Sequence, residues 1–493
     1  MPSNSFKTIR FLALAGGASI ALAACTTVPG SNVAAGSPIT AAEAAQGKEY
    51  HPQFLAEFGG AMTGSQAAYV EQIGTNVAVQ SGLGNTRSDY TVTLLNSSLD
   101  NAFAVPGGYI YITRQLVDLM NNEAELAAVL GHEVGHVSAR HSARRQETAQ
   151  RNQLLGILGQ ILSGAVFGNS ALGQLGQQIA GTAPQLATLS YSRNQEIEAD
   201  QLGVSYLKEA GYDPKAMATV LRSLAAQNAL ETQLQGRDHT TPEWASTHPD
   251  PAGRVQNALS LAGGGTGVTN RDTFLSRIDG LMYGDDPKQG VIEGRAFIHP
   301  DFRLTFSAPQ GFYLLNGAEA VSINGETGRA QLTTAPHNGN LSSYVSGVFQ
   351  RLGGSQAQVQ PQSIQTTTVN GLPAAYGVAR VSNGQQSVDV AVFAYEFSNS
   401  QAFHFVAITP AGQSGVFNSM FQSMRRISAA EAAQVIPRRI DVVTAQRGDT
   451  VATLAGRMAY TTAQEQRFRV LNGLSGSEGL VAGQKYKIVV KAN

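Results

Sequence analysis

The stretch His132-Glu133-Val134-Gly135-His136 decides which fold to expect from this chain. Residues four apart on an α-helix lie about 40° apart around the axis and about 6 Å apart along it, so the two histidines can point at one ion. Neutral imidazole suits zinc, and Glu133 then lies where it can act as a general base toward a water molecule on that ion. The stretch therefore predicts a zinc site on a helix. The alternative is a helix with two surface histidines.

The residues around this stretch predict where its helix begins and ends. Asn122 and Glu125 have the spacing of a capping box, and apolar residues follow at helical spacing as far as Val137. We expect one helix from Asn121 to about Ala149. On such a helix His141 would be turned about 140° from the second histidine of the motif, so we exclude it as a ligand.

A second helix supplies candidates for the third ligand that a catalytic zinc site needs beside one open position. This helix is expected to begin at Ser192 and to end at Gly211. Glu196 and Asp200 share one of its faces, whereas Glu198 points about 200° away from Glu196. Spacing alone leaves open which of Glu196 and Asp200 binds the ion and which supports it.

Turn and cap residues predict the neighbouring elements. Asp213-Pro214 and Asp250-Pro251 each combine an N-cap residue with proline at the first helical position, which predicts a third and a fourth helix. Alternating residues from Tyr90 to Thr113 flank Val105-Pro106-Gly107-Gly108 and predict one β-hairpin. The first part of the chain is therefore expected to be mainly helical.

The N-terminus resembles an export signal that ends in a lipid attachment site. Lys7 and Arg10 precede an apolar run from Phe11 to Ala24, which is too short to span a bilayer. The run ends in Leu22-Ala23-Ala24-Cys25, which resembles the bacterial lipobox, where the chain is cleaved before the cysteine and the thiol carries the lipid. Cys25 is the only cysteine, so internal disulfides are excluded. The alternative is an ordinary signal peptide beside a chance cysteine.

Charge and hydropathy restrict the partners. The chain has 34 Lys and Arg against 35 Asp and Glu, so no basic excess favours a nucleic-acid partner. No uninterrupted apolar run after Cys25 is long enough to cross a membrane, so we expect membrane attachment through the lipid alone. Thr26 is not the acidic residue associated with inner-membrane retention, which favours the outer membrane. The uncharged stretch from Asn152 to Ser192 predicts helices packed on the core, with a surface for lipid or unfolded clients as the alternative.

The motif and its downstream partner resemble a known family. HEVGH, followed by Tyr191-Ser192-Arg193 and Glu196-Ile197-Glu198-Ala199-Asp200, resembles the zinc metallopeptidases of family forty-eight, the gluzincins that include CAAX prenyl proteases. The resemblance covers about Tyr50 to Leu261. Because membrane-spanning runs are missing, it points to the soluble periplasmic branch of that family.

The resemblance also implies roles for individual residues. One Zn²⁺ per chain would be held by His132, His136 and Glu196, while Asp200 supports a ligand histidine. Glu133 would take a proton from the water that attacks the peptide carbonyl and return it to the leaving amine.

Two further segments match the family outside the metal ligands. Asn101-Ala102-Phe103-Ala104 resembles its substrate-side strand, where backbone groups would pair with an extended peptide. His248, followed by Arg254, matches a position where a histidine plugs the open coordination site or stabilises the oxyanion. The alternative for His248 is a surface histidine in a turn.

The rest of the chain is expected to form two more domains. After the Gly263 to Gly267 linker the periodicity becomes alternating, with a hairpin of Val388 to Phe397 and Gln401 to Ile408 and a closing helix at Phe417 to Met424. The scattered histidines of this region are expected to be structural: His299, His337 and His404. From Ile440 to Val490 the order strand, helix, helix, strand resembles a LysM module. That resemblance implies binding to peptidoglycan, and a packed cap without a ligand is the alternative.

The expected architecture is therefore multidomain. It combines a mainly α zincin-like (α+β) metallopeptidase domain with one β-hairpin, an α+β domain of unknown role, and a small LysM-like β-α-α-β module. The expected ranges are 1–24 for a lipoprotein signal peptide, 25–48 for a lipidated linker, 49–268 for the metallopeptidase domain, 269–432 for the α+β domain and 438–493 for the LysM-like module. Folded structure is expected to begin near Tyr50.

These observations together predict a zinc-dependent endopeptidase of the cell envelope. Its substrates would be misfolded or unassembled envelope proteins or peptides. Two alternatives remain: a zinc-bearing periplasmic chaperone that seldom cuts, and a peptidoglycan-binding scaffold whose peptidase domain is vestigial.

Overall fold

The computed structural model describes residues 36–142, 144, 191–235, 244, 247–353, 359–382 and 387–492 of the chain. The expected signal peptide, the lipid site at Cys25 and the helices expected between Asn152 and Ser190 lie outside these residues. Among the helices described, none has the length and apolar character needed to cross a membrane.

Folded structure begins earlier than expected. Helix α2 (Ala41–Glu57) starts inside the segment expected as a linker, nine residues before Tyr50. A capping box starts it, because Thr40 accepts a hydrogen bond from the backbone of Glu43 and the Glu43 side chain accepts one from the backbone of Thr40. Phe54 then anchors the helix in a cluster of aromatic side chains on the first sheet.

The first sheet has three strands: β1 (Thr91–Leu95), β2 (Ala102–Val105) and β3 (Tyr109–Thr113), in the order β1-β3-β2. Strands β2 and β3 form the expected antiparallel hairpin. Its turn needs glycine, because Gly107 and Gly108 have φ values of 100° and 84°. Strand β1 pairs parallel with β3, which extends the expected hairpin to a mixed sheet with β2 at one edge.

The motif helix and its main neighbours make the body of the first domain in the residues described. They are α3 (Ser65–Ala78), α5 (Glu123–Ser138), α8 (Arg193–Glu209), α9 (Ala216–Gln235) and α11 (Pro251–Ala262). Helix α5 lies in the centre and packs against α3, α8, α9 and β2. Three of the expected N-caps are present, since Asn122, Ser192 and Asp250 each accept a backbone hydrogen bond from the third residue after them. The fourth is not, because α9 begins at Ala216 and the Asp213 side chain accepts from the backbone of Lys215.

Helix α5 is shorter than expected and ends at Ser138 instead of about Ala149. The carbonyl oxygen of Ser138 accepts a hydrogen bond from Gly36 at 2.8 Å, so a preceding segment of the chain takes over one of the unpaired helix-end carbonyls. Arg140 then adopts a left-handed conformation with φ of 55°, and its side chain pairs with Glu43. The chain therefore changes direction at Arg140, directly before His141.

The first domain extends past the glycine-rich linker. Helix α12 (Arg271–Ile278) begins two residues after the expected start of the second domain. Its Phe274, Leu275 and Ile278 are buried in the same apolar core as α5. The core of the first domain thus includes residues that we expected in the α+β domain.

The α+β domain contains two antiparallel sheets, of seven strands in the order β11-β12-β13-β14-β10-β9-β8 and of four in the order β15-β7-β6-β5. The seven strands are β8 (Tyr313–Asn316), β9 (Val321–Gly325), β10 (Gly328–Pro336), β11 (Ile364–Val369), β12 (Leu372–Ser382), β13 (Ser387–Ser398) and β14 (Gln401–Pro410); the four are β5 (Val291–Glu293), β6 (Ala296–His299), β7 (Leu304–Ser307) and β15 (Arg425–Arg426). The helices are α13 (Leu341–Gly353), α14 (Asn418–Ser423) and α15 (Ala429–Ala433). The expected β13–β14 hairpin and the helix after it are present.

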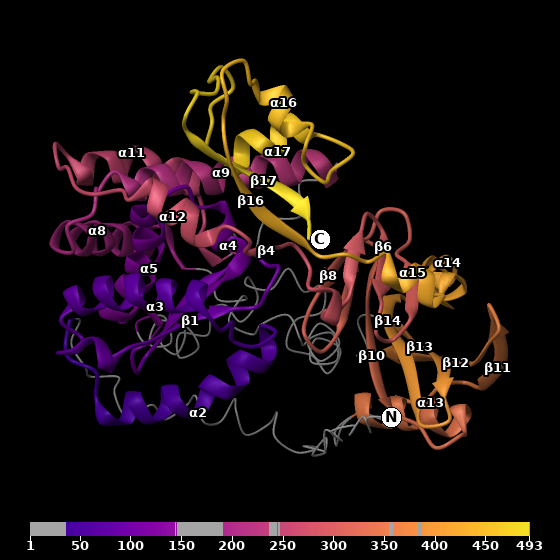
Figure 1. The fold of residues 1–493 in the computed structure, drawn as a ribbon. Helices are drawn as coiled ribbons and strands as arrows, with labels where there is room; N and C mark the ends of the chain where they lie inside the picture. Colours follow the sequence, from indigo (N-terminus) through magenta and orange to yellow (C-terminus); the bar gives the residue numbers. More distant parts are fainter. Residues whose placement is uncertain are drawn as a thin grey trace, which may run out of the picture.

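The C-terminal module has the expected order β16 (Arg438–Thr444), α16 (Val451–Ala455), α17 (Gln464–Leu471) and β17 (Lys485–Lys491). Strand β4 (Met282–Tyr283) joins its sheet, in the order β17-β16-β4. The module lies against α9 and α12 of the first domain, with the α+β domain on the other side of β4 (Figure 1). The module is thus packed on the first domain.

Candidate metal centre

Both motif histidines lie inside the protein on α5. His132 is 1% exposed and His136 is 3% exposed, and their Nε2 atoms lie 3.0 Å apart. The two side chains converge because they are four residues apart on one helix. The motif therefore forms one buried pair of imidazole nitrogens.

Glycines on α5 allow α8 to come close enough to complete this pair. A Cβ atom on Gly135 would lie 2.9 Å from the carbonyl oxygen of Ala199, and one on Gly131 would lie 3.5 Å from the carbonyl oxygen of Gly203, which is also on α8. The close approach of the two helices brings the buried carboxylate of Glu196 next to the histidines, with its Oε1 3.3 Å from His136 Nε2.

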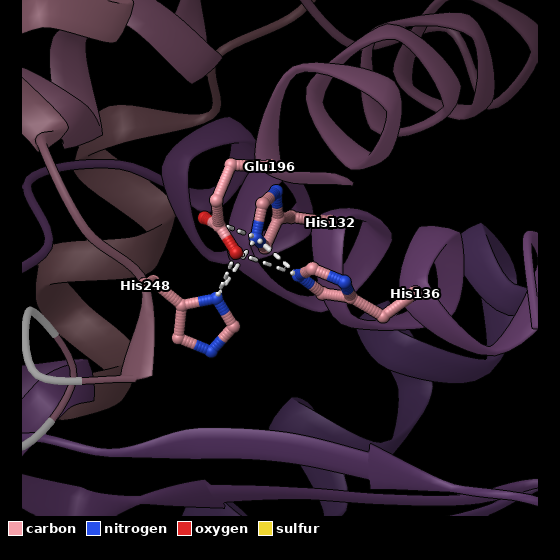
Figure 2. A group of neighbouring side chains, drawn as sticks. All are labelled: His132, His136, Glu196 and His248. Atoms are coloured by element: carbon pink, nitrogen blue, oxygen red, sulfur yellow. Dashed lines mark hydrogen bonds and ion pairs between the residues drawn. The ribbon is translucent and has the colours of Figure 1, made fainter. Parts of the chain in front are cut away.

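His248 closes the cluster from the chain segment before α11. Its Nδ1 lies 3.1 Å from Glu196 Oε1 and 3.3 Å from His132 Nε2, and the residue is 2% exposed. One donor atom from each of His132, His136, Glu196 and His248 lies within 4.8 Å of the others. Figure 2 shows the four side chains pointing toward one another from three separate parts of the chain.

The donor set and its spacing fit a zinc ion. Four donors about 2.0–2.1 Å from one ion in a tetrahedron lie about 3.3–3.4 Å from one another. Four of the separations here are close to that value: 3.0 Å between the two Nε2 atoms, 3.3 Å from His136 Nε2 to Glu196 Oε1, 3.1 Å from His248 Nδ1 to Glu196 Oε1 and 3.3 Å from His248 Nδ1 to His132 Nε2. Imidazole nitrogen and carboxylate oxygen are ordinary zinc donors, so the residues present suit this ion.

An ion pair between Asp200, one turn after Glu196 on α8, and Arg254 lies against His132. Asp200 Oδ1 lies 2.9 Å from His132 Nδ1, and Arg254 from α11 donates to both oxygens of Asp200, at 2.8 and 2.5 Å. Because Asp200 accepts from Nδ1 of His132, the lone pair of Nε2 is left to face the cluster. Arg254 also donates to Glu196 Oε2 at 2.5 Å, so one guanidinium supports two carboxylates.

This arrangement keeps the two carboxylates ionised. Burial raises the pKa of Asp200, but hydrogen bonds from Arg254 and His132 outweigh burial and lower that pKa below its ordinary value. Burial also raises the pKa of Glu196, and His248 together with the other two histidines lowers it further than burial raises it. Glu196 is therefore available as an anionic ligand.

Glu133 faces the cluster without belonging to it. The residue is 2% exposed, and its Oε1 lies 3.5 Å from His248 Nε2 and has no hydrogen-bond partner in the part of the chain that the structure describes. Burial raises the pKa of Glu133, although His248 and His132 oppose this. A carboxylate with a raised pKa next to a metal site is suited to accept a proton.

The expected substrate strand lies beside the motif helix. Ala102, Phe103 and Ala104 belong to β2, which packs against α5, and Asn101 precedes it. Within the described ranges β2 pairs only with β3, so one backbone edge of β2 is not used in the sheet.

Three aromatic or histidine side chains join the site without having been expected there. His141 Nδ1 lies 2.8 Å from His136 Nδ1, the ring of Tyr191 stacks on His136 at 3.8 Å, and the ring of Trp244 stacks on His248 at 4.7 Å. We had excluded His141 because the helix was expected to continue past it. It remains outside the set of metal donors, but it contacts one of them. No pattern around Trp244 indicates its position.

Comparison with known proteins agrees with this geometry. Residues 64–262 match the model of Peptidase family M48. The match contains every residue of the cluster and ends at the last residue of α11.

Several curated relatives are similar to part of this chain. The chain is 33% identical over 197 residues to the beta-barrel assembly-enhancing protease of Yersinia pestis, covering 39% of this chain and 38% of the relative. It is 30% identical over 240 residues to the protein of the same name from Escherichia coli K12, covering 48% and 47%. It is 34% identical over 161 residues to the mitochondrial metalloendopeptidase OMA1 of Arabidopsis thaliana, covering 32% and 29%. The chain thus spans less than half the length of each of these relatives.

Proposed function

We propose that this protein is a zinc-dependent endopeptidase of the cell envelope. The observation that carries the proposal is the buried group of His132, His136 and Glu196 with Glu133 beside it, at separations that suit one zinc ion. The M48 domain match supports the same activity independently of the distances. We assign His132, His136 and Glu196 as ligands and Asp200 and Arg254 as their supports.

The residues of the chain divide the reaction between them. Zinc, when bound, supplies a Lewis acid and lowers the pKa of a coordinated water molecule. Glu133 takes the proton that the attacking water loses and delivers it to the nitrogen of the leaving amine. The free edge of β2, with Asn101 to Ala104, holds the substrate as an extended strand through backbone hydrogen bonds.

His248 acts in this proposal as a plug of the resting site. Its Nδ1 occupies the fourth position of the donor set, where the attacking water would otherwise lie, and Trp244 stacks on its ring. The alternative is that His248 swings out and stabilises the oxyanion of the substrate.

The proposed substrates are misfolded or unassembled proteins of the envelope. The relatives named for assembly of β-barrels support this class. We propose a periplasmic location with a lipid on Cys25 that holds the protein at the outer membrane, because residues 7–25 combine basic residues, an apolar run and a lipobox-like end.

We further propose that the C-terminal module binds peptidoglycan. One side of the module packs on α9 and α12, while the segments around Gly448 and from Ser475 to Gly479 are exposed on it. A binding assay on purified peptidoglycan tests this role. It compares the full chain with a variant that carries substitutions in these two exposed segments. Equal retention of the two proteins would contradict it.

The experiment that tests the main proposal compares wild type with Glu133→Gln. Zinc content should be one ion per chain in both proteins, because Glu133 is not a ligand. Cleavage of casein should fall by about 10³-fold or more in the variant. Near-wild-type cleavage by Glu133→Gln would refute the assignment, and zinc uptake without any cleavage by wild type or His248→Ala would favour a chaperone or scaffold.

A further inference from the structure

The two motif histidines receive different support on the side that faces away from the cluster. His132 Nδ1 lies 2.9 Å from the carboxylate of Asp200. His136 Nδ1 lies 2.8 Å from the Nδ1 atom of another imidazole, that of His141, which is completely buried. His141 Nε2 in turn lies 3.1 Å from Glu198 Oε2.

The proton positions in this chain of contacts follow from its two ends. His136 directs Nε2 to the cluster, so its proton is on Nδ1 in the neutral ring. His141 Nδ1 must then accept that proton's hydrogen bond, which leaves its own proton on Nε2, where Glu198 accepts it. Each donor therefore meets an acceptor along His136, His141 and Glu198.

We propose that His141 is a positioning residue, which orients the ring of His136 for metal binding through the Nδ1–Nδ1 hydrogen bond and is itself held by Glu198. This inference rests on the proposed metal site. The inference also assigns a role to Glu198. Glu198 lies on the far side of α8 from Glu196, so it does not reach the ion, but it holds His141 and through it the ligand His136.

The backbone places His141 for this task. After α5 ends, the left-handed conformation of Arg140 turns the chain back toward the site. The carbonyl oxygen of His141 accepts a hydrogen bond from the side chain of Gln195 at 3.3 Å. The first turns of α8 thus hold His141 twice: Gln195 binds its carbonyl oxygen and Glu198 binds its ring. The same turns carry the ligand Glu196.

Substitutions that imitate one ring nitrogen each can separate positioning from space filling. In His141→Asn the amide oxygen can replace the Nδ1 acceptor, so the hydrogen bond from His136 is kept and the one to Glu198 is lost. In His141→Gln the longer amide reaches toward Glu198, and the partner of His136 is lost. His141→Ala removes both.

Zinc affinity, measured by competition with a chelator on the full chain, is the readout. We expect the Kd for zinc to rise by about 10–100-fold in His141→Gln and His141→Ala and much less in His141→Asn. The Co²⁺ absorption spectrum should change in the same order. Melting temperatures in chelator report folding of the metal-free variants. Equal losses in His141→Asn and His141→Gln, or no loss in any variant, would overturn the inference.

Glu198 provides a second test that does not depend on a core substitution, since its side chain is 39% exposed. Glu198→Ala should weaken zinc binding, and it should add little to the loss in His141→Ala because the two residues act in series. Glu209→Ala on the same helix is the matched control and should leave zinc affinity unchanged. Additive losses would overturn the serial arrangement. Absence of zinc from the wild type would overturn the proposed function itself. That outcome differs from failure of the positioning role alone, in which the wild type still binds zinc.

Discussion

The side-chain nitrogen of Lys487 lies 2.5 Å from the carbonyl oxygen of Met120. Lys487 is on β17, the last strand described. Met120 is the residue directly after α4 (Arg114–Leu119) and lies shortly before the residues that start the motif helix. The lysine is completely buried and also donates to the carbonyl oxygen of Asp118 at 2.7 Å. The C-terminal module is therefore tied to the entrance of α5.

Replacing Lys487 should destabilise the first domain as well as the module. Lys487→Met leaves two buried carbonyls without their donor, so we expect a loss of about 2–4 kcal/mol in the free energy of unfolding. Chemical denaturation of the full chain measures the loss. The exposed Lys491 on the same strand is the matched control, and Lys491→Met should change stability by less than about 0.5 kcal/mol. Equal effects of the two substitutions would show that the hydrogen bonds of Lys487 to the first domain do not contribute to stability.

Removal of His248 should activate the resting enzyme. If its imidazole competes with water for the fourth position, His248→Ala should increase the initial rate of peptide cleavage by roughly tenfold, which corresponds to about 1.4 kcal/mol of lost competition. Initial rates at saturating zinc measure this effect. A decrease in rate with unchanged zinc content would instead assign the oxyanion role to His248.

Zinc should stabilise the protein measurably. Binding to the folded state alone adds about 4 kcal/mol at a free zinc concentration of 1,000 times Kd. The melting temperature of wild type should therefore rise on addition of zinc and fall again with chelator. His132→Ala should show no comparable rise, and a shift of equal size in that variant would place the stabilising ion elsewhere.

The α+β domain should lose stability in mild acid. Burial, together with Arg351, lowers the pKa of His404 to about 3, and burial lowers that of His299 to about 4. Each ring is neutral in the folded domain but takes up a proton in the unfolded chain below pH 6.5, the ordinary value. Above pH 6.5 the two histidines do not reduce the free energy of unfolding, because they are neutral in both states. As the pH falls from 6.5 toward the pKa of the folded state, protonation of the unfolded chain lowers that free energy by up to about 1.4 kcal/mol per pH unit for each histidine.

Calorimetry of the full chain between pH 6.5 and pH 4 measures this loss. His404→Gln removes one titrating group, so the transition of the α+β domain should depend less steeply on pH in that variant. An unchanged slope would show that His404 does not carry the effect.

Local signals in the sequence were sufficient for much of the fold. In the site they indicated the two motif histidines, whereas the roles of Glu196, Asp200 and Arg254 were implied by the family resemblance. The caps at Asn122, Ser192 and Asp250, the turn at Gly107 and the four-residue spacing of the motif each depend on neighbours in sequence, and each was predicted where it occurs. The structure also brings Glu196, Asp200 and Arg254 together with the motif histidines.

The sequence analysis did not predict features that depend on residues far away along the chain. The end of α5 depends on Gly36 and on the left-handed Arg140, and neither is visible in the helical periodicity. The burial of Lys487 likewise depends on a segment far away in sequence. The contact of His141 with His136 was missed for this reason, because it exists only if the helix ends early, whereas the exclusion of His141 as a ligand agrees with the donor cluster.

The close contact of α5 with α8 at Gly135 makes one of the variable positions of HExxH an architectural requirement. A methyl group there would meet the carbonyl oxygen of Ala199 at 2.9 Å, which helix backbone cannot relieve by a change of rotamer. Gly135→Ala would therefore leave all metal donors in the chain and yet displace the helix that carries two of their supports and one ligand. A homologue with an intact motif but a larger residue at this position should be inspected for a compensating change on α8 before it is counted as an active peptidase.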